Sequence, residues 1–128
     1  MGHEFKGSGD RDLVFCNGVF HHIVPRERPA ALEQIRRSLR PRGLFAFWEN
    51  NPWNPGTRLL MRRIPFDRDA QTISAGEAKR MLSGHGFELV RTDHLFVFPR
   101  PLHRLRRIES GLSQVPIGAQ YQVLCRKR

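Results

Sequence analysis

The chain has 128 residues, 39% of them hydrophobic, and a formal net charge of +10. This length suits one domain over residues 1–128 with a single core, because two linked domains would each be too small to bury a comfortable one. No apolar stretch approaches the roughly 18 residues that cross a bilayer, and no apolar signal core follows Lys6, which argues against a membrane or exported protein. We expect residues 1–10 to form a disordered or edge extension.

Arginine supplies most of the positive charge, since only three of the 22 basic residues are lysine. The arginines are spread along the chain, with modest clusters at residues 36–42, 62–63 and 104–107. Each cluster falls on the polar side of a predicted helix, where a charged stripe is usually the solvated face. Binding of nucleic acid or another polyanion is therefore the alternative function, and we regard nucleic acid as an unlikely partner.

The first element in chain order is a short, nearly continuous apolar run at residues 12–18 (DLVFCNG). Such a run, ending in Asn-Gly, is typical of a strand buried on both faces, as in a parallel sheet. It contains Cys16, and a second apolar run contains Cys125. We expect both to be buried free thiols rather than a disulfide, which suits a soluble protein of the reducing cytoplasm.

A helix is predicted next, beginning at Pro29, with apolar residues at helical spacing at Leu32, Ile35 and Leu39. Residues 41–43 (PRG) are expected to end it, and residues 43–48 (GLFAFW) to form a second apolar strand. A strand, a helix and a strand joined in this way form a right-handed unit with parallel strands.

The second half of the chain predicts further elements. A loop at residues 50–56 precedes a short helix through Leu59, Leu60 and Ile64, with Asn54 as its cap. Ser74 and Glu77 have capping-box spacing for another helix, which Gly84 or Gly86 would end. Residues 87–90 and 95–98 read as one bent strand or two pieces, a last amphipathic helix spans 102–112, and 121–125 form a final strand.

Polar residues follow both predicted parallel strands. Asn17 and Gly18 end the first strand, and Glu49, Asn50 and Asn51 end the second. Ligands of open α/β sheets bind outside the carboxyl ends of the strands, so these five residues are candidate site residues on one rim. Ordinary turn chemistry explains the same residues equally well.

A histidine pair, His21 and His22, lies just beyond the first strand. These side chains can support a turn, contact substrate or accept a proton. We expect no metal site, because no third ligand stands at a usual spacing.

Several stretches together are similar to class I S-adenosylmethionine-dependent methyltransferases. Residues 12–23 (DLVFCNGVFHHI) and 38–43 (SLRPRG) resemble the family's D-L-V, L-H-H-L and L-R-P-G-G patterns. Residues 49–55, 65–69 and 116–121 resemble one bacterial branch. The resemblance covers roughly residues 11–127, corresponding to the carboxyl-terminal half of the family's fold.

The resemblance implies an α/β fold: a partial Rossmann-like methyltransferase sheet of four strands, mostly parallel with an antiparallel last strand, flanked by helices. It implies methyl transfer from S-adenosylmethionine to a small molecule by direct displacement. Cofactor contacts carry over to Asn17, Gly18 and Val19, and substrate contacts to Asn50, Asn51 and Arg58. His21, His22 and Glu49 are the candidate bases, and the sequence does not choose among them.

The family's glycine-rich turn after its first strand, and the acidic residue that holds the ribose, have no counterpart in this sequence. We therefore expect cofactor binding and activity of the chain alone to be weak or lost. The first strand would lack its usual neighbour, so residues 13–16 would offer an apolar edge. This predicts a homodimer formed by edge pairing or strand exchange.

Overall fold

The computed structural model describes residues 8–63, 71–95 and 118–128, together with residues 104, 107–108, 111–112 and 114. The side chains of residues 60 and 61 are outside this description. Most of the expected extension at 1–10, and most of the expected helix at 102–112, lie outside the described residues. None of the described helices is long and apolar enough to cross a membrane.

One sheet organises the described chain. Its strands are β1 (Arg11–Asn17), β2 (Leu39–Asn50), β3 (Phe87–Leu95) and β4 (Gln120–Lys127), in the order β1-β2-β4-β3. β1 and β2 are parallel, and β4 is antiparallel to both β2 and β3. The predicted four-strand, mostly parallel sheet with an antiparallel last strand is therefore confirmed.

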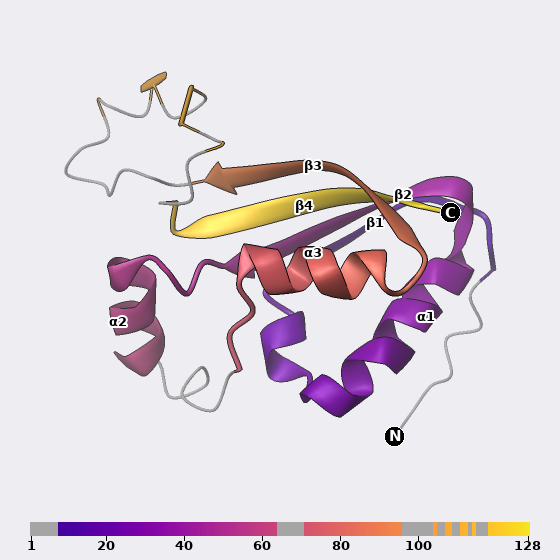
Figure 1. Ribbon diagram of the computed structural model, residues 1–128, viewed down its shortest axis with the longest axis horizontal. Coiled ribbons are helices and arrows are strands. Elements are labelled where there is room, and N and C mark those ends of the chain that lie inside the picture. The colour runs from indigo at the N-terminus through magenta and orange to yellow at the C-terminus, as the bar shows by residue number, and fades with distance from the viewer. Residues whose placement is uncertain are drawn as a thin grey trace.

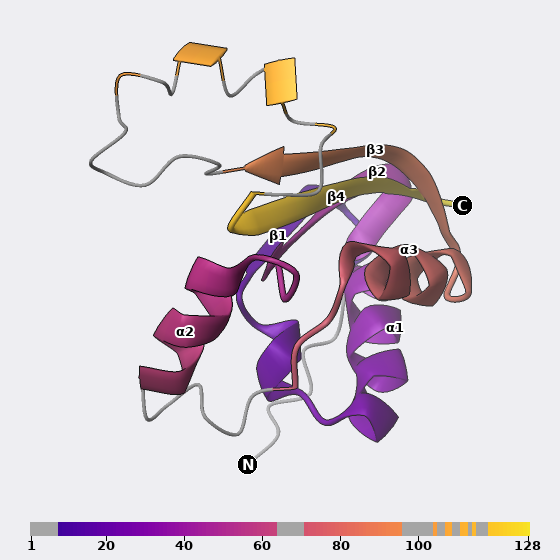
Figure 2. The same ribbon diagram turned by 60° about the vertical axis from the view of Figure 1, so that its left-hand side comes forward.

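Helices connect the strands. α1 (Arg28–Ser38) follows the single-turn helices η1 (Phe20–His22) and η2 (Pro25–Glu27), whereas α2 (Pro55–Arg63) and α3 (Ala75–Ser83) lie between β2 and β3. Figures 1 and 2 show α1 and α3 against one face of the sheet, with α2 beyond the end of β2. Within the described residues, no α-helix covers the opposite face (Figures 1 and 2).

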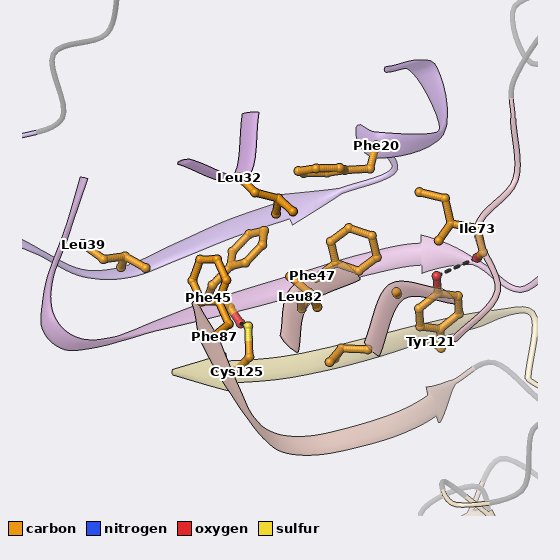
Figure 3. Close-up of a cluster of buried hydrophobic side chains, with 12 residues drawn as sticks. Phe20, Leu32, Leu39, Phe45, Phe47, Ile73, Leu82, Phe87, Tyr121 and Cys125 are labelled. Carbon is orange, nitrogen blue, oxygen red and sulfur yellow. Dashed lines mark hydrogen bonds between the residues drawn. The ribbon is translucent and has the colours of Figure 1, made fainter. Parts of the chain in front are cut away.

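The core fills the space between the sheet and α1 and α3 (Figure 3). Aromatic side chains dominate it, and Phe45 packs against both Phe47 and Phe87 with ring centroids 6.1 and 5.6 Å apart. Leu32 of α1 and Leu82 of α3 are fully buried against these rings. Each such side chain contributes about 1.5–3 kcal/mol when fully buried, so this layer holds β2 in place.

The expectation that the first strand is buried on both faces is wrong. Val14 and Cys16 face the core, but Leu13 and Phe15 point to the other face and are 55% and 57% exposed. Since no described α-helix covers that face, alternate residues of β1 remain in contact with solvent. Phe15 is partly sheltered by the edge of the Trp48 ring, 5.9 Å away between centroids.

The expectation that residues 41–43 end the helix is also wrong, because the helix ends earlier. α1 ends at Ser38, and residues 41–43 belong to β2, which starts at Leu39. The register with β1 shifts at this point, because Arg11 pairs with Leu39 but Leu13 pairs with Leu44. The extra residues form a bulge in which Arg42 has a φ of +66°, so this stretch bends within the strand rather than preceding it.

Local signals for the later helices are confirmed. The Asn54 side chain accepts a hydrogen bond from the Thr57 N–H at 3.0 Å, and the Ser74 hydroxyl accepts one from the Glu77 N–H at 3.2 Å. Gly84 caps the end of α3. β3 is one strand over Phe87–Leu95 with a register shift between Leu89 and Arg91, which agrees with the single bent strand as far as Leu95. Residues 96–98 of that prediction lie outside the described residues.

Candidate functional site

The carboxyl ends of β1 and β2 lie side by side, as parallel pairing requires. Asn17 is paired with Trp48, and the Gly18 N–H donates a 3.0 Å hydrogen bond to the Trp48 carbonyl. Gly18 has a φ of +66°, a conformation that side-chain-bearing residues rarely adopt. The chain therefore turns sharply at the rim and leaves Asn17 and Val19 exposed there.

Glu49 and His21 form a buried pair beneath this rim. Their side chains are only 1% and 4% exposed, and His21 Nδ1 lies 2.7 Å from Glu49 Oε2. The His21 main-chain N–H donates a second hydrogen bond to Glu49 Oε1 at 3.2 Å. Because an ionised carboxylate only accepts, it selects the His21 tautomer with the proton on Nδ1. Both carboxylate oxygens thus hold the loop after β1 to the tip of β2.

Two titratable groups near this pair, Tyr121 and Cys16, have raised pKa values. Tyr121 is the residue of β4 paired with Glu49, and its hydroxyl donates a 2.6 Å hydrogen bond to the Ile73 carbonyl. Burial raises the pKa of Tyr121, and the Glu49 charge raises it further. Burial and then Glu49 also raise the pKa of Cys16. Neither of these two groups ionises near neutral pH.

The two candidate histidines occupy different environments. His21 is buried, including its Nε2 atom, whereas the neighbouring His22 is exposed. Their ring centroids lie 4.0 Å apart. Of the pair, His22 is the one placed to meet a molecule arriving from solvent, and His21 is placed to orient the loop. Among the described residues, no group of three or more potential metal ligands occurs.

Asn50 and Asn51 also differ. The buried Asn51 side chain donates to the Gly118 carbonyl at 2.8 Å and accepts from the Trp53 N–H at 3.1 Å. Asn51 N–H donates to the Ala119 carbonyl at 2.8 Å. Asn51 therefore ties the rim loop to the start of β4. Asn50 is half-buried, and its side-chain oxygen accepts from Gln120 at 3.2 Å.

Arg58 lies on the exposed side of α2, at the edge of a shallow cavity of about 280 Å³. The cavity is also lined by Pro52, Trp53, Thr72, Ser74 and Glu77. Its most exposed apolar group is Trp53, at 74%. The residues that line this cavity come after the end of β2 in the sequence, so Arg58 lies beyond the rim residues and is not one of them.

Two site neighbours did not come from sequence reasoning. The first is Tyr121, the chain's single tyrosine, which lies beside Glu49. The second is Gln71, whose main-chain N–H donates a 2.9 Å hydrogen bond to the His21 carbonyl and so ties the segment before α3 to the site. For Tyr121, the signal in the sequence was a single tyrosine within an apolar strand. The Gln71 contact is made by main-chain atoms, so no side-chain pattern in the sequence indicates it.

The arginines of residues 36–42 pair with acidic side chains. Arg36 and Arg37 both pair with Glu33, at 2.9 and 3.0 Å. Arg40 pairs with Asp12, and Arg42 pairs with Glu88 at 3.2 Å. Hydrogen bonds from Arg36 and Arg37 hold the pKa of Glu33 down at about 2. Since these arginines are paired with acidic side chains, they give no specific support to polyanion binding.

The sequence matches a protein family described as methyltransferase domain over residues 5–47. This segment contains β1, α1 and most of β2. No curated protein matches the chain in sequence.

Solved structures share the fold. A S-adenosylmethionine-dependent methyltransferase from Archaeoglobus fulgidus is 14% identical with a TM-score of 0.63, covering 91% of this chain and 59% of its own. A Burkholderia thailandensis 1,6-didemethyltoxoflavin-N1-methyltransferase, solved with 1,6-didemethyltoxoflavin and S-adenosylhomocysteine, is 20% identical with a TM-score of 0.63, covering 97% of this chain and 47% of its own. The [4+2]-cyclase SpnF is 14% identical with a TM-score of 0.61, covering 93% and 50%. The chain thus spans about half to three fifths of these proteins.

Proposed function

We propose that this chain belongs to the class I S-adenosylmethionine-dependent methyltransferase family. We further propose that it takes part in methyl transfer to a small molecule and holds part of the cofactor at the rim of β1 and β2. The observation that carries the proposal is the joined rim, in which Gly18 is bonded to Trp48 and Glu49 holds the loop through His21. Sites of this kind lie outside the carboxyl ends of parallel strands.

Asn17, Gly18 and Val19 would contact the methionine end of the cofactor. The fit is supported by the exposure of Asn17 and Val19, and by a glycine turn that lets a ligand approach the backbone. No described residue corresponds to the family's glycine-rich turn, so this chain supplies part of the pocket. When bound, S-adenosylmethionine supplies an electrophilic methyl group on a positively charged sulfur.

The chain's own residues would act mainly by alignment, because correct placement of the reactants supplies much of the rate of such a displacement. Glu49 and His21 are positioning residues in this proposal, since both are buried and bonded to each other. His22, exposed beside them, would accept a proton from a substrate that must lose one. Asn50 and Arg58 would face the substrate, and Asn51 would hold the loop that presents them.

The proposed setting is the cytoplasm. Its support is chemical: Cys16 and Cys125 are both free thiols in the structure, and secreted domains of this size commonly use disulfides. The second candidate function, polyanion binding, gains no comparable support from the paired arginines of residues 36–42.

Titration calorimetry with S-adenosylhomocysteine tests the cofactor proposal, using Gly18→Ala and the matched variant Gly86→Ala. Both glycines have positive φ, at +66° and +87°, so both variants should lose about 1 kcal/mol of stability. Only Gly18 lies at the rim. We expect Gly18→Ala to weaken binding about tenfold or more, and Gly86→Ala to leave it unchanged.

Absence of heat at millimolar S-adenosylhomocysteine would remove the proposed activity while leaving the fold as described. Equal loss of affinity in both glycine variants would show that general destabilisation, not the rim, controls binding. A similar fold also occurs in the [4+2]-cyclase SpnF, so the fold alone does not establish methyl transfer. Cofactor binding should therefore be measured before methyl transfer is assayed.

A further inference from the structure

Residues 71–74, which we call the connector, lead into α3 and contact two parts of the proposed site. The Gln71 N–H donates a 2.9 Å hydrogen bond to the carbonyl of His21, in the loop after β1. Thr72 and Ser74 line the cavity of about 280 Å³ beside α2. The connector therefore borders both the loop that we propose holds the cofactor and the cavity next to the proposed substrate contacts.

The middle of the connector is fixed on the core. The Ile73 side chain is only 1% exposed, and its carbonyl accepts a 2.6 Å hydrogen bond from the Tyr121 hydroxyl (Figure 3). Gln71, the first residue of the connector, is instead exposed and belongs to no helix or strand. With no buried side chain to fix it, Gln71 is held by the hydrogen bonds of its main chain.

Arg28, the first residue of α1, joins the connector to the loop after β1. Its Nε donates a 3.0 Å hydrogen bond to the Ile23 carbonyl, and its Nη2 donates a 3.2 Å hydrogen bond to the Gln71 carbonyl. The guanidinium presents its donors in a rigid plane, so one side chain holds two acceptors in a fixed relation. Both main-chain polar groups of Gln71 thus serve to join the two segments.

We propose that Arg28 is a positioning residue, which holds the loop after β1 and the connector in one fixed arrangement. This inference rests on the proposed function, since that function assigns the cofactor to the loop and the substrate to the region of Arg58. Methyl transfer needs both reactants in one geometry, and a small displacement of either slows the reaction. Arg28 would contact neither reactant and would act through Ile23 and Gln71.

Amide hydrogen exchange of the full chain, followed by NMR, tests whether Arg28 joins the two segments. Arg28→Met keeps an unbranched side chain and removes both donors. We expect the N–H groups of Gln71 and Ile23 to exchange about tenfold faster or more, while amides of β2 and β4 keep their rates. The matched variant Arg36→Met, on the same helix, also removes two hydrogen bonds, both to Glu33, and should leave these two rates unchanged.

S-adenosylhomocysteine gives a readout that a purely structural role would not move. In the unmodified chain, ligand bound at the loop after β1 should slow exchange of the Gln71 N–H, because Arg28 joins that loop to the connector. In Arg28→Met this slowing should be lost, and the calorimetric affinity should fall about tenfold or more. Arg36→Met should keep both properties.

Arg28→Lys separates charge from geometry. Lysine keeps the positive charge but lacks the planar fork, so it should restore one of the two contacts and give exchange rates between those of Arg28→Met and the unmodified chain. Unfolding of Arg28→Met would be recognised by fast exchange of the β2 and β4 amides as well, and the lysine variant then carries the test.

The possible failures are distinguishable. Unchanged exchange at Gln71 and Ile23 in a folded Arg28 variant, equal effects of Arg36→Met, or unchanged affinity in Arg28→Met would each overturn the positioning role. Absence of heat with S-adenosylhomocysteine in the unmodified chain would overturn the proposed function. The exchange rates would then still decide whether Arg28 joins the two segments.

Discussion

Glu49 shows how much one buried carboxylate can organise. It is 1% exposed, lies at the end of β2, and uses both oxygens on His21. From the sequence it is an acid next to Trp48, and nothing local indicates that it is buried rather than presented to substrate. We propose that Glu49 keeps the loop after Gly18 against β2, because both of its hydrogen bonds join residues that are 28 positions apart in the sequence.

Glu49→Gln tests this role. Glutamine keeps the shape and can still accept from the His21 N–H, but it loses the charge-assisted bond to the ring. We expect a loss of about 2 kcal/mol in unfolding free energy by urea denaturation. The control Glu33→Gln breaks exposed pairs with Arg36 and Arg37 and should cost about 0.5 kcal/mol or less. Similar losses in both variants would contradict a special role for the buried pair.

Tyr121 makes stability depend on alkaline pH. Its pKa is raised above the ordinary 10.0 by burial, so the unfolded chain releases this proton at lower pH than the folded chain. Above about pH 10 the unfolded state binds fewer protons, and stability falls by up to about 1.4 kcal/mol per pH unit for this group. Burial also raises the pKa of Cys125 from 9.0 to about 12, which adds a decline that starts about one unit earlier.

Tyr121→Phe should therefore flatten the alkaline decline. The variant loses the hydrogen bond to the Ile73 carbonyl, which costs about 1 kcal/mol at neutral pH. The wild-type and variant stabilities should then converge between pH 10 and 12, while their difference stays constant from pH 7 to 8. Parallel curves across the whole range would show that Tyr121 ionises in the folded protein as it does in the unfolded chain.

The sequence predicted correctly those features of the helices that depend only on neighbouring residues. The caps of α2 and α3 followed from Asn54 and Ser74, because a side chain that caps a helix acts within three residues. Residues 41–43 were taken as the end of the helix although they lie within β2, because the bulge there is set by pairing with Arg11, which is far away in sequence. Pro and Gly in a strand carry the same local signal as Pro and Gly in a loop.

Because of the bulge, we expect glycine substitutions at Arg42 and Arg40 to change the stability of the protein in opposite directions. Arg42 has a φ of +66°, which costs a side-chain-bearing residue about 1 kcal/mol or more. Arg42→Gly should stabilise the protein by about 0.5 kcal/mol, even though it removes the exposed pair with Glu88. Arg40→Gly, which also removes an exposed pair but not a positive φ, should destabilise by about 1 kcal/mol. Thermal unfolding of the two variants compares them directly.

For the whole molecule, the family resemblance predicted the sheet, since the antiparallel last strand beside the second follows from it and not from periodicity. The exposure of Leu13 and Phe15 could not be predicted, because which sheet face is covered depends on all the packed elements together. The different burial of His21 and His22 could not be predicted for the same reason. Two adjacent histidines differ only through the residues packed around them, such as Glu49 beside His21.

The position of β4 has a consequence for how the protein is made. β4 is the last described strand in chain order, yet it lies between β2 and β3. The two residues just before it, 118 and 119, accept the hydrogen bonds that tie the rim loop to this strand. Until it emerges, β2 has only β1 as a partner and β3 has none among the described strands. The described sheet therefore cannot close until residues 118–127 have left the ribosome, and until then β3 stays unpaired with these strands and open to misassembly.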